Sequence, residues 1–81
     1  MSHLNQLNDV KEDITVYVEY GYHTIAVIVY KRQLISEILE ACLIKFNLND
    51  YHIENSLGMV LKTSWSCAVL NHHQRLFIKK D

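Results

Sequence analysis

Proline is absent from this chain of 81 residues, and glycine occurs only twice, at Gly21 and Gly58. Two isolated glycines cannot form the glycine-rich loop that cradles the phosphates of a nucleotide, so a site of that kind is excluded. Each glycine instead predicts a tight reversal of the chain, because glycine adopts positive φ without steric cost. The absence of proline also means that no strand edge is protected by this residue.

Cysteine is equally scarce, with Cys42 and Cys67 as the only two. Cys42 falls on the apolar face of a predicted helix and Cys67 in a later loop, so we expect two reduced thiols and no disulfide. A nucleophilic cysteine would need a histidine that is held in turn by a third group. The sequence does not exclude such a meeting for Cys67, but a small domain without a cleft favours a structural thiol.

A strong charge of one sign is lacking as well. The net charge is -1, with 49% apolar and 21% charged residues, which is typical of a soluble globular domain and gives no general attraction to nucleic acid or anionic lipid. No apolar run approaches the roughly 20 residues that span a bilayer, and the start MSHLNQLNDVKED does not resemble a signal peptide. We therefore expect one cytoplasmic domain that is not an enzyme, with no nucleic-acid partner and no membrane insertion.

The clearest helical pattern is LISEILEACLIKFN, residues 34–47. Its apolar residues recur at the three-and-four spacing of one helix face, namely Ile35, Ile38, Leu39, Cys42 and Phe46. Asn47 is a plausible left-handed terminator. The preceding residues 31–33 supply no good capping side chain. The pattern therefore predicts one helix with an apolar face, a well-defined end and a poorly defined start.

Strand-like patterns lie on both sides of this helix. Residues 14–20 and 23–30 are β-rich runs around Gly21, which predicts a hairpin. Later segments predict a strand at residues 51–55, a short strand at 59–61 and a last strand at 75–79. Residues 62–71 have no clean period, and we expect Trp65, Val69 and Leu70 to anchor them in the core. Residues 1–13 read as a flexible N-terminal arm and residues 14–81 as the domain.

Alternation within the hairpin predicts which side chains face the helix. The inward set is Ile14, Val16, Val18, Ile25, Val27 and Val29. The outward set includes four apolar residues that we predict to form a contiguous partner-binding patch: Tyr17, Ala26, Ile28 and Tyr30. An alternative is that the N-terminal arm covers this patch through Leu4, Leu7 and Val10. The predicted partner is a protein or a second copy of the chain, bound through the second strand.

The chain contains five histidines, a residue type that often binds metal ions. His3, His23 and His52 are scattered, and only His72 and His73 are adjacent. Adjacent histidines in a turn are expected to point in different directions, and no cysteine or carboxylate follows at a ligand spacing. We therefore predict neither a metal site nor a cofactor.

The order strand, strand, helix, strand, short strand, strand at this length resembles the ubiquitin-like β-grasp fold, an α+β fold. The resemblance includes the opening strand Ile14-Thr15-Val16-Tyr17-Val18 and implies a mixed sheet of four to five strands crossed by one helix, with the last strand central and parallel to the first. Conjugated members of the fold need a tail ending in Gly-Gly. This sequence ends IKKD, so we expect it not to be a conjugated modifier.

Within the fold, the sequence is similar to the small YukD and EsaB proteins of type VII secretion systems in Gram-positive bacteria. The similar segments are IENSLGMVL at residues 53–61 and VLNHHQRLFI at residues 69–78. That family usually carries a Gly-Asp pair in the final turn, where this chain has His72-His73-Gln74-Arg75. The resemblance implies an accessory protein-interaction component of the secretion machinery, with other parts of that machinery as partners.

A second functional class remains open. Ras-binding and Ras-association domains share the fold and bind a small GTPase by pairing their second strand with its edge, aided by basic residues. Lys31 and Arg32 follow the second strand here, but residues 23–30 contain no basic side chain other than His23. Binding through this junction is expected to weaken steeply with salt, whereas an apolar strand contact is not.

Overall fold

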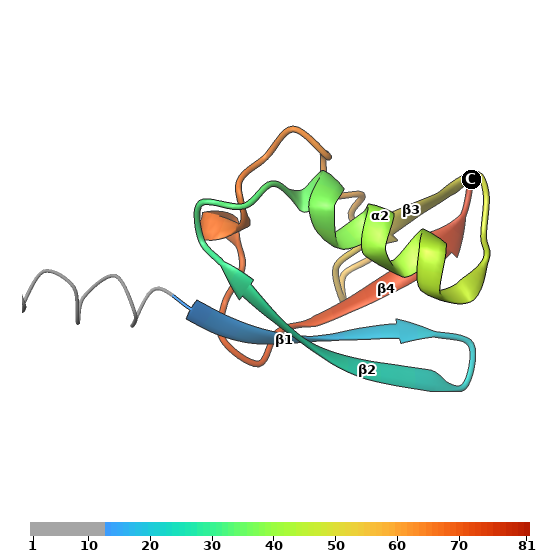
Figure 1. Ribbon diagram of the computed structural model, residues 1–81, viewed down its shortest axis with the longest axis horizontal. Coiled ribbons are helices and arrows are strands. Elements are labelled where there is room, and N and C mark those ends of the chain that lie inside the picture. Colours follow the sequence, from blue (N-terminus) through green and yellow to red (C-terminus); the bar gives the residue numbers. More distant parts are fainter. Residues whose placement is uncertain (1–12) are drawn as a thin grey trace, which may run out of the picture.

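The fold is one mixed sheet with a helix across one face, seen in a computed structural model that describes residues 13–81. The elements are β1 (Asp13–Tyr20), β2 (His23–Tyr30), α2 (Ile35–Phe46), β3 (Tyr51–Glu54), the 3-10 helix η1 (Cys67–Val69) and β4 (Arg75–Lys80). The strand order is β2-β1-β4-β3. β4 is parallel to β1, and both outer strands are antiparallel to their neighbours (Figure 1). This confirms the predicted β-grasp arrangement, with the last strand in the centre.

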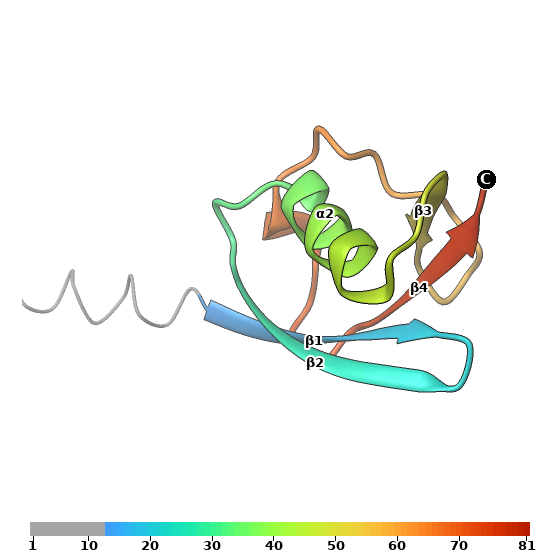
Figure 2. The same ribbon diagram turned by 45° about the vertical axis from the view of Figure 1, so that its right-hand side comes forward.

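The core lies between α2 and the inner face of the sheet. Its β1 residues are those predicted from alternation, and the rest come from every other element: Ile14, Val16, Val18, Val29, Ile35, Ile38, Cys42, Ile53, Leu61, Cys67, Leu70, Leu76 and Ile78. Ile25 and Val27 of β2 also face inward but stay half-buried. Figure 2 shows α2 on one side of the sheet and no described element beneath β1 and β2 on the other. The sheet therefore has one covered and one open face.

Long-range hydrogen bonds hold the start of α2. The Ile35 N–H donates to the Trp65 carbonyl at 2.8 Å, and the Ser36 N–H donates to the Thr63 carbonyl at 3.1 Å. The Leu34 N–H donates to Glu37 Oε2 at 2.9 Å. These partners satisfy N–H groups that a first helical turn leaves unpaired. At the other end, Asn47 has φ 55 and is the predicted left-handed cap. Within residues 13–81, no helix has the length and apolarity needed to cross a membrane.

Three sequence predictions near β3 and η1 are wrong. Residues 59–61 form no strand, because only the single bridge between Glu54 and Val60 pairs them with β3. Trp65 and Val69 do not anchor the core: they remain 38% and 53% exposed. The fold uses the backbone carbonyl of Trp65, whereas the centre of the Trp65 ring lies 5.9 Å from Lys62 Nζ. Leu70 is buried as predicted.

The strand limits also differ slightly from those predicted. β3 ends at Glu54, because Asn55 leaves the strand to hold the following turn: its Oδ1 accepts hydrogen bonds from the N–H groups of Leu57 and Met59. β1 begins at Asp13, one residue before its predicted start. The remainder of the predicted arm, residues 1–12, lies outside the described residues, and so does its suggested contact with the open face.

Both cysteines are free, buried thiols. Burial raises the pKa of Cys42, against an opposing effect of Lys45, and it raises that of Cys67 together with the charge of Glu37. The thiolate is the reactive form, so the raised pKa makes both thiols less reactive. Burial also shields them from reagents. We expect slow labelling by a thiol reagent in native buffer and fast labelling in denaturant. Fast native labelling of Cys42 would contradict the packing of α2.

Candidate protein-binding surface

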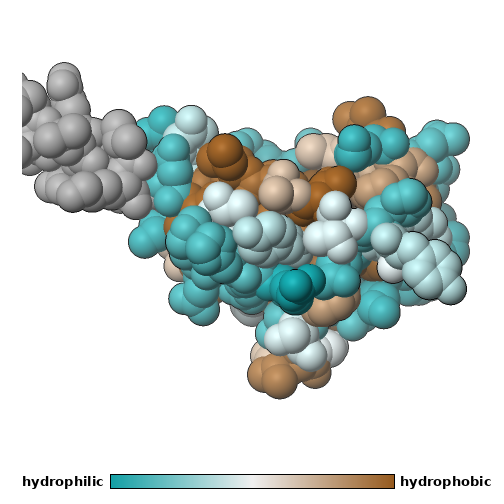
Figure 3. Space-filling view, turned by 90° about the horizontal axis from the view of Figure 1, so that it is seen from below, coloured by the Kyte–Doolittle hydropathy of each residue, from teal (hydrophilic) through white to brown (hydrophobic). Residues whose placement is uncertain are grey.

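The four predicted patch residues lie on the open face of the sheet. Tyr17 is the cross-strand neighbour of Ala26, and Ile28 lies opposite Thr15. Ile28 is 68% exposed and Tyr30 is 45% exposed, whereas Tyr17 is half-buried. Viewed from below, the molecule shows hydrophobic areas separated by polar ones (Figure 3). Because Ala26, Ile28 and Tyr30 alternate along β2 and Tyr17 lies opposite Ala26, the structure places the four predicted residues beside one another on one face.

Polar side chains of β1 and β4 border these four residues. Arg75 Nη1 forms an ion pair with Glu19 Oε2 at 2.7 Å, and the Arg75 guanidinium carbon lies 6.0 Å from the centre of the Tyr17 ring. Phe77 and Lys79 share the same face, because Leu76 and Ile78 between them point inward. The exposed apolar side chains of this face are therefore concentrated on β2. The alternation of residues 75–79 in the sequence is sufficient to predict that Arg75, Phe77 and Lys79 share this face.

No residue of the described range 13–81 pairs with the middle of the outer edge of β2. A two-residue loop joins Tyr20 and His23, and Gly21 in this loop has φ 59. In such a hairpin the two residues that flank the loop bond to each other, and bonded pairs then alternate along the strands. Residues 23, 25, 27 and 29 therefore bond to β1, while the backbone groups of Thr24, Ala26 and Ile28 point to the free edge.

The end of this edge supports the assignment. Tyr30 belongs to the outward-pointing series, and its N–H donates to Gln33 Oε1 at 2.8 Å while its carbonyl accepts from the Gln33 N–H at 2.9 Å. On the opposite edge of the sheet, the Leu61 N–H donates to the Ile53 carbonyl at 2.9 Å, so β3 is covered. Among residues 13–81, β2 is thus the strand with an uncovered edge.

The turn before β4 differs from its prediction. The rings of His72 and His73 do not diverge but stack, with centroids 3.7 Å apart. His72 Nδ1 accepts a hydrogen bond from the Thr15 N–H at 3.0 Å, and the His73 N–H donates to the Thr15 carbonyl at 2.6 Å. Both residues thus bond to Thr15 of β1, His72 through its ring and His73 through its backbone. The pair therefore ties the turn to β1.

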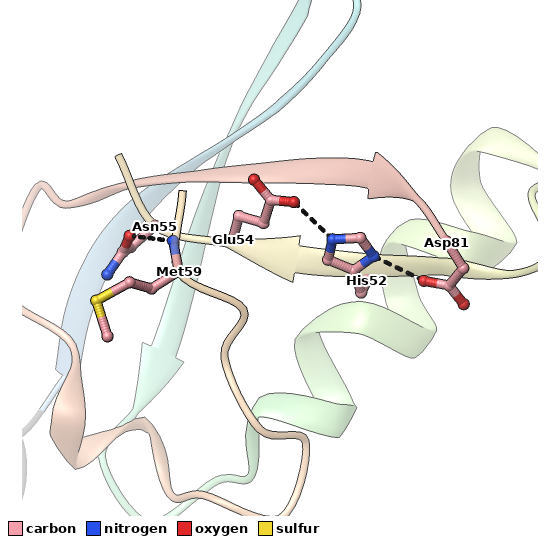
Figure 4. Close-up of polar contacts among 5 residues, drawn as sticks. All are labelled: His52, Glu54, Asn55, Met59 and Asp81. Carbon is pink, nitrogen blue, oxygen red and sulfur yellow. Dashed lines mark hydrogen bonds and ion pairs between the residues drawn. The ribbon is translucent and has the colours of Figure 1, made fainter. Parts of the chain in front are cut away.

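A second polar cluster, which the sequence analysis missed, lies on β3 (Figure 4). His52 Nε2 is 2.6 Å from Glu54 Oε2, and its Nδ1 is 2.7 Å from Asp81 Oδ1. A neutral imidazole has only one N–H, so only the protonated ring can donate to both carboxylates. The hydrogen bonds to Glu54 and Asp81 accordingly raise the pKa of His52, against a smaller opposing effect of burial.

This pKa shift predicts how stability depends on pH. A folded-state pKa above the unfolded value stabilises the fold fully below the unfolded pKa of about 6.5, and the contribution is lost as pH rises through the folded value. We expect the free energy of unfolding to fall as pH rises from about 6.5 through the raised pKa of His52, and His52→Gln to remove this part of the dependence. Urea denaturation of both proteins across that range measures it. Identical pH profiles would contradict the role of His52.

Within residues 13–81, no group of three histidine, cysteine or acidic side chains is placed to hold a metal ion. Cys67 is fully buried beneath the loop, which is unsuited to attack on a substrate. An edge strand with exposed apolar side chains can pair with another polypeptide, so the open face and edge of β2 are a candidate protein-binding surface.

Comparisons with known proteins support the fold. No family model matches the sequence, and no curated protein matches it. Ubiquitin from Caldiarchaeum subterraneum aligns with a TM-score of 0.73 at 8% identity, covering 85% of this chain and 94% of that one. The ubiquitin-like domain of an Arabidopsis thaliana protein aligns with a TM-score of 0.71 at 16% identity, covering 86% and 80%. The chain has the ubiquitin-like β-grasp fold.

A third solved structure is a larger protein. One chain of the pParkin-pUb-UbcH7 complex aligns with a TM-score of 0.78 at 14% identity, covering 89% of this chain. This chain spans only 24% of the length of that protein. At such identities the likeness concerns the fold, and function must be argued from the surface.

Proposed function

We propose that this chain is a non-enzymatic protein-interaction module that binds its partner through β2. The observation that carries the proposal is the open edge of β2 beside exposed Ile28. Natural edge strands are usually protected by charge, proline or a bulge, and His23–Tyr30 has no Asp, Glu, Lys, Arg or proline. An unprotected edge beside apolar side chains is suited to a polypeptide that adds a strand. Tyr17, Ala26, Ile28 and Tyr30 are the proposed contact residues.

The proposed setting is the cytoplasmic side of a bacterial type VII secretion system, where the chain would act as an accessory or regulatory component. Support comes from the resemblance in residues 53–61 and 69–78. The last turn lacks the Gly-Asp pair that is usual in that family. His73 in this turn has φ 69, a conformation that glycine adopts more easily. The free thiols Cys42 and Cys67 suit a reducing compartment.

A deletion experiment tests this setting. We expect the gene to lie beside those of a membrane ATPase and small helical secreted proteins, and its deletion to stop export of these proteins. The wild-type gene and an Ile44→Lys variant should restore export, because Ile44 is exposed on α2, far from the sheet's open face. An Ile28→Lys variant should not. Unchanged export after deletion would refute the secretion role.

A small GTPase is the second candidate partner. Lys31 and Arg32 are both exposed, and the Arg32 guanidinium carbon lies 5.7 Å from the centre of the Tyr30 ring. Positive charge is thus held at the end of the open edge, where an acidic GTPase edge would meet it. Binding of this kind should weaken steeply between low and high salt and be lost in an Arg32→Glu variant, with Lys62→Glu as the charge-matched control. Salt-independent binding would exclude this candidate.

A further inference from the structure

We infer that β2 pairs with β2 of a second copy of this chain, antiparallel and centred on Ala26, to form one continuous eight-stranded sheet. The inference rests on the proposed function, since it names a partner for the same edge. A two-fold axis requires each surface to be complementary to itself. The edge of β2 meets this requirement in its backbone, its side chains and its charge.

The backbone pattern is symmetric about Ala26. Thr24, Ala26 and Ile28 have outward-pointing N–H and carbonyl groups, whereas those of Tyr30 are occupied by Gln33. With the axis at Ala26, this residue pairs with its own copy, and Thr24 pairs with Ile28 of the second copy. Each outward group then has a partner, which gives roughly six hydrogen bonds between the chains. No other centre within the strand pairs all of these groups.

The side chains also fit a symmetric pairing. The smallest, Ala26, lies at the axis, where two identical side chains come closest. On the inner face, Ile25 would lie opposite Val27 of the copy, and both are only half-buried in one chain. The pairing would therefore cover apolar surface that α2 leaves incompletely covered. Tyr22, which is fully exposed, would lie near Tyr30 of the second copy.

Charge is compatible with the same arrangement. A charged residue near a two-fold axis meets its own copy, which is unfavourable. The segment His23–Tyr30 contains no Asp, Glu, Lys or Arg, so no such repulsion arises. Lys31 and Arg32 follow the strand and would lie beside the copy's hairpin turn, away from their own counterparts. This neutrality favours a second copy over a strongly charged partner strand.

Disulfide trapping tests both the partner and the register. In the proposed dimer the two Ala26 Cα atoms lie about 5.5 Å apart, within the range for a disulfide. Thr24 and its own copy are displaced by four residues, about 13 Å along the strand, and so are the two copies of Ile28. Ala26→Cys should therefore cross-link on mild oxidation, and Thr24→Cys and Ile28→Cys alone should not. A mixture of the last two should cross-link with each other.

These experiments use the full chain, in which the native cysteines Cys42 and Cys67 are buried. Sedimentation equilibrium of the wild type should give a mass that rises with concentration toward twice 9.5 kDa. A monomer at all concentrations, or equal cross-linking of the three single variants, would overturn the inference. A monomer whose Ala26→Cys thiol is also shielded from reagent would overturn it in favour of coverage by residues 1–12.

Failure of this inference is distinguishable from failure of the proposed function. A monomeric chain that still binds a protein partner through Ile28 would overturn the dimer and leave the interaction module intact. If the chain cross-links as expected but deletion of its gene leaves secretion unchanged, the dimer is supported and the secretion role is refuted.

Discussion

Replacing Leu76 by alanine is expected to destabilise the fold by about 2 to 5 kcal/mol, the range for removing a large buried aliphatic side chain. Leu76 has no exposed surface and lies on β4, one of the two central strands, beside Val18 of β1. Small domains have total stabilities of roughly 5 to 15 kcal/mol, so this loss is a large fraction of the whole. Urea denaturation of the wild type and Leu76→Ala measures the difference.

The matched control for this prediction is Ile44→Ala. Ile44 is 81% exposed on the outer side of α2, so its truncation should change stability by no more than about 0.5 kcal/mol. Similar effects of the two variants would show that β4 does not occupy the centre of the core. A Leu76→Ala protein that unfolds at the wild-type urea concentration would do the same.

Replacing Ile28 by lysine is expected to abolish association while the chain remains folded. Ile28 is 68% exposed on the open face, so the stability cost should be about 1 kcal/mol or less. The lysine places a charge on an apolar contact, and in a dimer it would stand opposite Thr24 of the second copy. Light scattering for self-association, and pull-down with a purified secretion component, measure the loss.

Ile44→Lys is the control for this second prediction, because it introduces the same charge at another exposed isoleucine, which lies on α2. It should keep both kinds of association. If Ile28→Lys unfolded the chain, Ile28 would belong to the core, contrary to the register of β1 and β2. If it remained folded and every association survived, the open face of β2 would not be the interface.

Local patterns predicted much of this fold. Alternation in residues 14–20 identified the inward residues of β1, and the three-and-four spacing identified the face of α2 that bears Cys42. Asn47 was recognisable as a helix cap, and the hairpin followed from Gly21. These features depend on neighbours in sequence, so the chemistry of a few adjacent residues was sufficient.

Features that depend on distant residues were not predictable in this way. The start of α2 is capped by carbonyls of Thr63 and Trp65, about 30 residues later in the chain. The apolar ring of Trp65 predicts a place in the core, yet the fold uses its backbone carbonyl. The cluster around His52 depends on Asp81, which only the pairing of β3 with β4 brings near.

The binding surface was predicted in part. Alternation placed Tyr17, Ala26, Ile28 and Tyr30 on one face, as the structure has them. It did not show that Arg75 and Glu19 form an ion pair on the same face, since these two residues are 56 positions apart in sequence. Nor did it show that the outer edge of β3 is covered, which depends on where residues 59–61 fold. Among residues 13–81, the outer edge of β2 has no such cover.

Hydrogen exchange of the β2 amides tests the central claim, that the open edge of this strand is the binding site, most directly. In the free monomer the amides of Thr24, Ala26 and Ile28 should exchange fast, and those of Ile25, Val27 and Val29 slowly, because only the second set bonds to β1. On association, the first set should become protected while the second changes little. Fast exchange of Ala26 and Ile28 in the associated state, with new protection confined to α2 or β3, would contradict the account.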